Sequence, residues 1–276
     1  MNRFLNRALG EIAARRGLIF EEHSGGWIVR VGNGHRHLEA YGYLLSLNAG
    51  VASLMARDKA AAAQRLELDG IPTVATALVL NDLRQAWVDR RDTRAAFDDA
   101  MARLDPPFVV KPNEGSSGVG VTRADDAVAA WAATERLLAT EPAVVVQPIV
   151  AIASEERWVL LGDQPLLRYA KAPAAGPVPM YNLARGATIT SWGVEEGPAE
   201  GLALARAARR ALGLATAAVD LLTDVDGRTI VMEVNAGWSF EHLVRIRPDT
   251  RPTAVAAYEA AVDVALGLRS LRGVAR

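Results

Sequence analysis

The stretch FVVKPNEGSSGVGVT, residues 108–122, is the most informative in the chain. It carries three glycines and, between the first two, a pair of serines: Gly115, Ser116, Ser117, Gly118 and Gly120. No Lys-Ser/Thr pair follows the glycines as in a Walker A loop, and no helix opens after them as in a Rossmann fingerprint. Beyond the loop, valines alternate with small residues and predict a return to a strand. The stretch therefore predicts a glycine-rich loop between two strands.

Lys111 lies at the end of the apolar run that leads into this loop. A buried ammonium needs an anionic partner. Glycines allow backbone N–H groups to approach an anion closely, and serine hydroxyls add donors. A phosphate group would satisfy all of them. The stretch alone leaves one alternative open, an ordinary Gly/Ser hairpin loop beside a lysine that reaches solvent.

A second polar cluster lies in VDLLTDVDGRTIVMEVN, residues 219–235. Asp226-Gly227 is typical of a two-residue type I′ turn, and counting outward from it places Asp220 opposite Glu233, about 5 Å away. Asn235 shares the face of Glu233, because strand side chains alternate. The alternate side chains are expected to enter a core: Ile230, Met232 and Val234. Facing carboxylates need a cation or a proton, and these oxygens suit Mg²⁺. A solvated acidic face is the alternative.

Composition limits the class of protein. The chain has 276 residues, of which half are hydrophobic and 23% charged, with a formal net charge of −1. This composition argues against disorder and against a nucleic-acid partner held by a basic field. The absence of cysteine excludes disulfides, thiol nucleophiles and iron–sulfur clusters. No apolar run reaches the roughly 18 residues of a membrane span, and no signal-peptide core is present. We expect a cytoplasmic protein without a membrane partner.

Apolar strands alternate along the chain with Ala- and Arg-rich helices. The predicted helices cover residues 1–16, 58–68, 125–139, 198–212 and 252–268. The predicted strands cover residues 18–22, 27–31, 37–41, 73–80, 108–111, 143–149, 157–161, 165–170, 217–222 and 229–235. Such hairpins mixed with helices predict α+β layers, not a regular parallel α/β sheet.

The two motifs, in this order, resemble the ATP-grasp superfamily of carboxylate–amine ligases, and most closely its RimK-like and glutathione-synthetase-like branch. The resemblance runs from about Arg57 to Phe240. Four further segments contribute to it. They resemble the opening "DK…L…GIP" segment, the hinge strand under adenine, the "D-x-R…V-x-G" strand and the "N-L-x-x-G" loop, at residues 56–72, 144–149, 155–163 and 181–186.

This resemblance implies an ATP-grasp fold of two α+β subdomains that clasp ATP. We expect a short N-terminal α/β module of helix and hairpin over residues 1–56, a central subdomain with the phosphate loop over 57–149, and a C-terminal subdomain with the magnesium site over 150–276. The implied cofactors are ATP and Mg²⁺, with Mn²⁺ as a substitute. The implied ATP contacts are Lys59, Lys111, Gly115, Ser116, Ser117, Gly118, Gln147, Ile149 and Glu155. The implied metal ligands are Asp220, Glu233 and Asn235.

The activity implied is amide-bond formation on amino acids or small peptides, between two molecules or within one. A carboxylate would attack the γ-phosphate, and an amine would displace phosphate from the acyl-phosphate. Arg157 and Arg185 are candidates for holding these oxyanions, because an arginine fork matches them; an ordinary surface arginine is the alternative for each. An ATP-dependent phosphotransferase and a non-catalytic nucleotide-binding regulator remain alternative functions. The Ala-rich N-terminal module would also suit a homodimer interface.

The chain departs from the family pattern at three places. Gln147 is followed by Pro148 where the family usually has glutamate, so that side-chain contact to adenine is missing. Glu155 stands in place of the usual aspartate. After Asn235 comes Ala-Gly-Trp-Ser-Phe instead of a Pro-Gly turn. Trp238 and Phe240 are therefore expected to reshape the acceptor side of the pocket.

Overall fold

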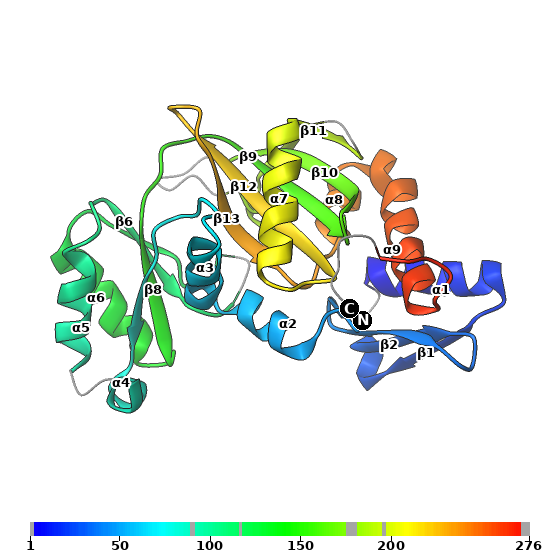
Figure 1. Ribbon diagram of the computed structural model, residues 1–276, viewed down its shortest axis with the longest axis horizontal. Helices are drawn as coiled ribbons and strands as arrows, with labels where there is room; N and C mark the ends of the chain where they lie inside the picture. Colours follow the sequence, from blue (N-terminus) through cyan, green and yellow to red (C-terminus); the bar gives the residue numbers. More distant parts are fainter. Residues whose placement is uncertain (1–2, 89–91, 116–117, 175–180, 195–196, 272–276) are drawn as a thin grey trace.

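The computed structural model describes residues 3–88, 92–115, 118–174, 181–194 and 197–271. In this part of the chain every pairing between strands is antiparallel, and the strands form three sheets flanked by helices (Figure 1). The predicted α+β class is therefore confirmed. No helix within the described ranges is long and apolar enough to cross a membrane.

Helix α1 (Phe4–Arg16) packs on the N-terminal sheet and buries Leu5, Leu9 and Ile12. The strands of this sheet pair in chain order and are β1 (Ile19–His23), β2 (Ile28–Gly32), β3 (His37–Tyr41) and β4 (Leu44–Leu45). A 3-10 turn, η1 (Ser24–Gly26), joins the first two strands. The helix and the three strands predicted here are all present.

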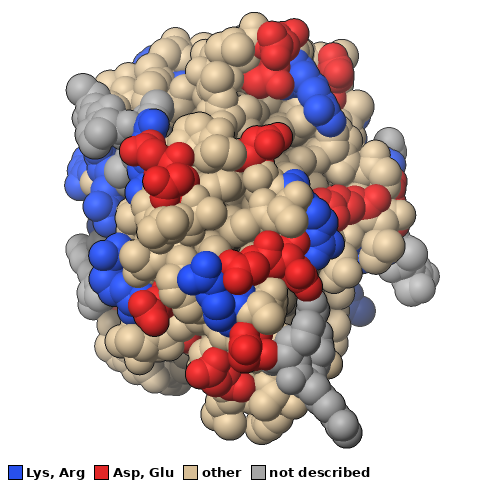
Figure 2. Space-filling view, turned by 90° about the vertical axis from the view of Figure 1, so that its left-hand side faces the viewer, with Lys and Arg blue, Asp and Glu red and all other residues tan. Residues whose placement is uncertain are grey.

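The central sheet has the order β5-β8-β6-β7. Its strands are β5 (Ala77–Leu80), β6 (Phe108–Pro112), β7 (Thr122–Ala124) and β8 (Ala143–Pro148). Helices α5 (Thr93–Met101) and α6 (Ala127–Leu138) share one apolar core with it, and α4 (Asp82–Val88) follows β5. The glycine-rich stretch joins β6 to β7, as predicted. Basic and acidic side chains are interspersed on this side of the molecule (Figure 2).

The C-terminal sheet has the order β11-β10-β9-β12-β13. Its strands are β9 (Ile152–Leu161), β10 (Gln164–Ala172), β11 (Thr188–Gly193), β12 (Thr216–Asp224) and β13 (Thr229–Asn235). On one face pack α2 (Gly50–Arg57), α3 (Lys59–Leu68) and α7 (Ala199–Ala211). The chain closes with α8 (Glu241–Ile246), the 3-10 turn η3 (Pro248–Thr250) and α9 (Arg251–Ala265).

The two faces of the C-terminal sheet belong to different cores. Trp158 and Leu160 of β9 face α2, α3 and α7. Val159 and Leu161 face the other way, toward α1, α9 and the N-terminal sheet. Toward the central sheet this second face is no longer covered by apolar side chains. It carries polar groups there, and these form the site described below.

Some predicted elements differ from the structure. The strand expected over residues 73–80 begins only at Ala77, because Thr73 makes an isolated bridge to Val231 of β13 instead. The predictions lack helices α2, α4, α5 and α8 and strands β4 and β11. Helix α3, which the predicted division assigns to the central subdomain, packs against the C-terminal sheet. The three-part division of the chain stays a prediction.

Candidate active site

A cavity of about 490 Å³ lies between the central and C-terminal sheets. The hinge from β8 to β9, residues 147–150, borders it at one end. The far end is bordered by α8, by the loop around the 3-10 turn η2 (Leu183–Arg185) and by Tyr43 of the N-terminal module. Most of the residues singled out from the sequence line this cavity. They are Lys59, Lys111, Gly115, Gly118, Gln147, Ile149, Glu155, Arg157, Asp220, Glu233 and Asn235.

Asp220 lies directly opposite Glu233, as the hairpin prediction required, but the path between them differs. The turn is a three-residue loop rather than a two-residue one, because Asp224 N donates to Arg228 O at 3.0 Å and Gly227 takes a φ of +83°. That shifts the register by one residue. A bulge at Met232 shifts it back, because Leu221 pairs with Val231 while Asp220 pairs with Glu233.

Met232, at the bulge, lies at the border of a core and the cavity. As predicted, it packs with Ile230, in a small core with Val74 and Leu222, but it is only half-buried and also borders the cavity, and Val234 belongs to a different core. Ile230 and Val234 are buried as expected. The thioether therefore adds an apolar surface beside the two carboxylates.

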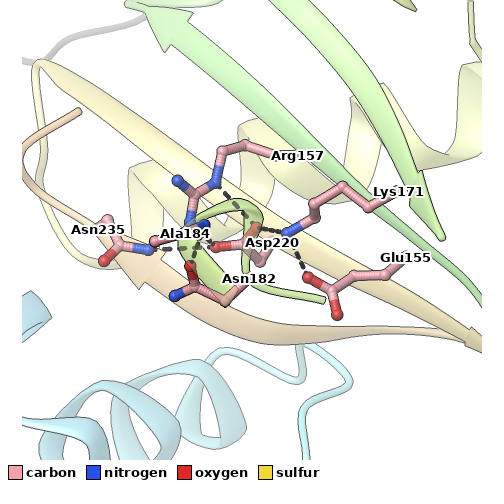
Figure 3. Close-up of polar contacts among 7 residues, drawn as sticks. All are labelled: Glu155, Arg157, Lys171, Asn182, Ala184, Asp220 and Asn235. Carbon is pink, nitrogen blue, oxygen red and sulfur yellow. Dashed lines mark hydrogen bonds and ion pairs between the residues drawn. The ribbon is translucent and has the colours of Figure 1, made fainter. Parts of the chain in front are cut away.

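Asp220 is the centre of a buried ion cluster (Figure 3). Its Oδ1 accepts from Arg157 Nε at 2.9 Å and from Lys171 Nζ at 3.0 Å. Its Oδ2 accepts from Arg157 Nη2 and, at 3.3 Å, from the Asn235 amide. Burial alone would raise the pKa of this carboxyl, but the charges and hydrogen bonds of Arg157 and Lys171 outweigh burial and lower it to about 2. Asp220 is therefore ionised at any physiological pH.

Lys171 was not predicted from the sequence. It comes from β10, is 7% exposed and bridges Asp220 to Glu155 (Figure 3). Burial would lower the pKa of its ammonium, yet the attraction of Asp220 raises it. Burial raises the pKa of the Glu155 carboxyl, although Lys171 opposes the rise. Glu155 uses only Oε1 for Lys171, and its buried Oε2 has no hydrogen-bond partner among the described residues. That oxygen is available to a ligand.

Two lysines face the cavity from the other side. Lys59 Nζ donates to Gly115 O at 2.9 Å and so holds the start of the glycine-rich loop. Burial lowers the pKa of the Lys111 ammonium, and the nearby Glu233 carboxylate opposes this. Gly115 and Gly118 both line the cavity, whereas Ser116 and Ser117 lie outside the described residues. The cavity thus meets cations on both walls, which suits an anionic ligand.

The hinge end of the cavity is more apolar. Val109, Ile152 and Leu222 line it together with Ile149. The Gln147 amide does not point freely into the space, because it donates to Thr76 Oγ1 at 2.7 Å. The Ile149 backbone N–H donates to Pro107 O at 2.7 Å. These surfaces suit a flat, largely apolar ring system, and the roles of Gln147 and Ile149 in binding it stay predictions.

Arg157 and Arg185, the two predicted oxyanion holders, lie in different surroundings. Arg157 is inside the ion cluster. Arg185 ends η2, is exposed and does not border the cavity, although its neighbours Asn182 and Ala184 do. Asn182 Oδ1 accepts from Ala184 N at 2.8 Å and shapes this turn (Figure 3). The catalytic role of both arginines stays a prediction.

The aromatic residues expected to reshape the acceptor side are mostly core. Trp238 is 2% exposed, stacks on Tyr258 with ring centroids 5.0 Å apart and donates to Thr216 Oγ1 at 2.8 Å. Phe240 is fully buried and does not line the cavity, whereas Trp238 borders it. Trp238 and Phe240 together form the floor beneath the far end of the cavity, and Ser239 and His242 lie at its surface.

Comparison with known proteins assigns the family. Residues 56–248 match the model of the RimK-like ATP-grasp domain. The chain belongs to the RimK-like ATP-grasp family. ATP and Mg²⁺ are the cofactors of this family. The predicted resemblance is thereby confirmed, and the matched residues include every polar side chain of the ion cluster.

Curated relatives of this ATP-grasp chain carry ligase names. A probable alpha-L-glutamate ligase from Xanthomonas campestris is 33% identical over 192 residues, which are 68% of this chain and 60% of that protein. Probable alpha-L-glutamate ligase 1 from Shewanella denitrificans is 35% identical over 137 residues, 49% of this chain and 45% of that protein. The chain thus spans about half to three fifths of the length of these relatives.

Solved structures show the same fold. A D-alanine–D-alanine ligase from Bacillus anthracis has a TM-score of 0.58 and 21% identity, over 80% of this chain and 71% of that one. The D-cycloserine synthetase DcsG has a TM-score of 0.57 and 24% identity, over 75% and 71% of the two chains. These likenesses establish the ATP-grasp fold of the chain.

The donor set fits the Mg²⁺ of the family. Asp220, Glu233 and Asn235 bring hard oxygens to one sheet face. The described residues contain no group of three Asp, Glu or His side chains arranged for a metal ion, so the Asn235 amide is needed to complete the set. Because Asp220 already accepts four hydrogen bonds, a metal ion has to replace at least one of its present donors.

Proposed function

We propose that this protein is an ATP-dependent carboxylate–amine ligase that forms an amide bond through an acyl-phosphate. The observation that carries the proposal is the ion cluster of Asp220, Arg157 and Lys171 beside Glu233 and Lys111, in one cavity of an ATP-grasp chain. The names of its relatives favour an amino acid, with L-glutamate first, as a substrate. A cytoplasmic location and a homodimer stay predictions.

The cavity suggests an order for the bound groups. Adenine takes the apolar hinge end, the Glu155 oxygen without a partner accepts a ribose hydroxyl, and the phosphates lie between Lys111 and Asp220. Asp220, Glu233 and Asn235 would hold Mg²⁺, which would neutralise part of the phosphate charge. Lys59, Lys111 and the glycine-rich loop bring further positive charge and backbone donors to the same phosphates.

Arg157 then has two tasks. Its guanidinium orients Asp220 through two hydrogen bonds, and its remaining planar donors would hold the substrate carboxylate. The carboxylate oxygen attacks the γ-phosphorus and ADP leaves. The amine nitrogen next attacks the acyl carbon, loses a proton, and inorganic phosphate leaves. Positioning and electrostatics account for the chemistry without a protein nucleophile.

A hydroxylamine trap tests this function. The protein is incubated with ATP, Mg²⁺, hydroxylamine and each of the twenty amino acids in turn. We expect at least one acid to give its hydroxamate together with ADP and inorganic phosphate. Glu233→Gln should abolish the signal, while Asp98→Asn, at an exposed carboxylate paired with Arg94 on α5, serves as the control.

Other products would support other functions. ADP with the phosphate kept on a stable product would identify the phosphotransferase alternative. Nucleotide binding without turnover for any of the acids would identify the regulatory alternative. AMP and pyrophosphate would show adenylation of the acid and refute the acyl-phosphate route.

A further inference from the structure

The far end of the cavity has no role in the assignments above. It is lined by Tyr43, Ser239 and His242, and α8 packs there against η2. With adenine at the hinge and the phosphates over Lys111, this end receives the part of the substrates that lies beyond the reacting carbon. The groups that face it therefore decide what kind of amine is accepted.

His242 is held in one tautomer. Arg245 Nη2 lies 2.8 Å from His242 Nδ1. A guanidinium can only donate, so Nδ1 accepts and the neutral ring carries its proton on Nε2. Burial lowers the pKa of His242 and Arg245 adds to this, which keeps the ring neutral at pH 7. Nε2 has no hydrogen-bond partner among the described residues. His242 is therefore a hydrogen-bond donor and not a base.

The neighbouring carboxylate is already engaged. Glu241 accepts a hydrogen bond from Phe4 N and lies 3.9 Å from Arg7. It ties α8 to the N-terminal helix, and although Glu241 itself also borders the cavity, these contacts engage both of its oxygens, so that donors remain free at this end. One of these is the Ser239 hydroxyl, whose oxygen already accepts from Glu241 N at 3.1 Å. This end of the cavity therefore favours a ligand group that accepts hydrogen bonds.

Tyr43 closes the same end with an aromatic wall. The guanidinium of Arg3, 5.3 Å from the ring centroid, lies over it. Arg3 is 3% exposed and is fixed by a 2.6 Å hydrogen bond to Gly42 O. The N-terminal module thus contributes the Tyr43 ring, packed against the buried Arg3, to the wall of the cavity.

We propose that His242, positioned by Arg245, binds the carboxylate of the amine substrate, so that the amine is an amino acid rather than a simple alkylamine. This inference rests on the proposed ligase function and adds the residue that selects the nucleophile. A planar anion with two acceptor oxygens matches the Nε2–H donor together with the Ser239 hydroxyl. The amino group of the same molecule is then directed toward the acyl carbon, and its carboxylate does not react.

Nuclear magnetic resonance of the histidine rings tests the proposal without turnover. The protein with bound ADP and Mg²⁺ is titrated with each of the twenty amino acids, and the His242 signals are assigned by their loss in His242→Leu. We expect the nitrogen shifts of a neutral ring protonated on Nε2. At least one amino acid should move these signals with saturation, and its carboxamide should bind at least about tenfold more weakly.

Variants separate positioning from general stability. Arg245→Gln should weaken amino-acid binding by about tenfold and lose the fixed tautomer signature, whereas Arg247→Gln, which breaks a pair with Asp249 just beyond α8, should change neither. A proton on Nδ1, His242 signals that no amino acid moves, or equal binding of amino acid and carboxamide would overturn the proposal. Failure of the ligase function would appear separately, as an absence of hydroxamate in the trap.

Discussion

Lys171 Nζ lies 3.0 Å from Asp220 Oδ1, where it occupies a lone pair that the proposed metal site requires. The same ammonium pairs with Glu155, so one buried cation serves two carboxylates. With Arg157 on the other side of Asp220, the cluster is balanced before any ligand arrives. We therefore expect Lys171 to compete for Asp220 with the metal ion proposed to bind there.

Substitution of Lys171 tests this competition. Lys171→Met should lower the free energy of unfolding by about 3–5 kcal/mol, because it leaves Glu155 buried without its cation. Millimolar Mg²⁺ should raise the melting temperature of this variant more than that of the wild type. Arg168→Met is the matched control, since it removes a 2.7 Å hydrogen bond to Glu156 on the opposite sheet face. Equal magnesium shifts in Lys171→Met and the wild type would refute the competition.

The ion pairs of Asp163, away from the site, are expected to make a pH-dependent contribution to the free energy of unfolding. Asp163 lies in the turn between β9 and β10, and the hydrogen bonds of Arg210 and Arg209 lower the pKa of its carboxyl. A depressed pKa in the folded state contributes stability above the unfolded value of about 3.9 and loses it as the pH falls through the folded value. Asp163→Asn should cost about 1–2 kcal/mol at pH 7.

Urea unfolding across a pH series measures this effect. The difference between wild type and Asp163→Asn should shrink steadily below pH 4, while Asp105→Asn, at an exposed position, should cost little at any pH. A difference that stays constant down to pH 2 would show that the ion pairs are not its cause.

Gly237 connects the N-terminal module to the floor of the site. A Cβ at this position would lie 2.8 Å from the backbone oxygen of Tyr43. Gly237→Ala should therefore push β4 away from its bridge to Gly237 and cost about 1–3 kcal/mol of stability. Gly50→Ala, where a Cβ meets nothing within 4 Å, is the control and should be neutral or slightly stabilising. Equal stability of the two variants would mean that the bridge contributes nothing.

Much of the site follows from the sequence because the carboxylates lie on neighbouring strands of one hairpin. The pairing of Asp220 with Glu233 is predicted correctly although the turn is not, since the longer loop and the bulge at Met232 shift the register in opposite directions. The observed pairing depends on both irregularities, the three-residue loop and the bulge. Local turn preference alone does not reveal either of them.

Lys171 shows why other residues of the site could not be predicted from the sequence. Counting outward from the turn at Gly162-Asp163 places Glu155 opposite Ala170, with Lys171 on the other face. An extra residue, Leu166, bulges out of β10 and moves Lys171 opposite Glu155. No turn signal marks that bulge. His242 is equally hidden, because its role depends on a contact with Arg245 and on α8, a helix too short for its periodicity to be recognised.

The most direct test of the central claim follows one oxygen atom. The acid identified by the hydroxylamine trap is labelled with ¹⁸O in its carboxylate and incubated with ATP, Mg²⁺ and its amine. An acyl-phosphate carries a carboxylate oxygen to phosphorus, so the account predicts one ¹⁸O in each inorganic phosphate released, seen by mass spectrometry or by the ³¹P isotope shift. Inorganic phosphate free of ¹⁸O, with the amide formed, would contradict it.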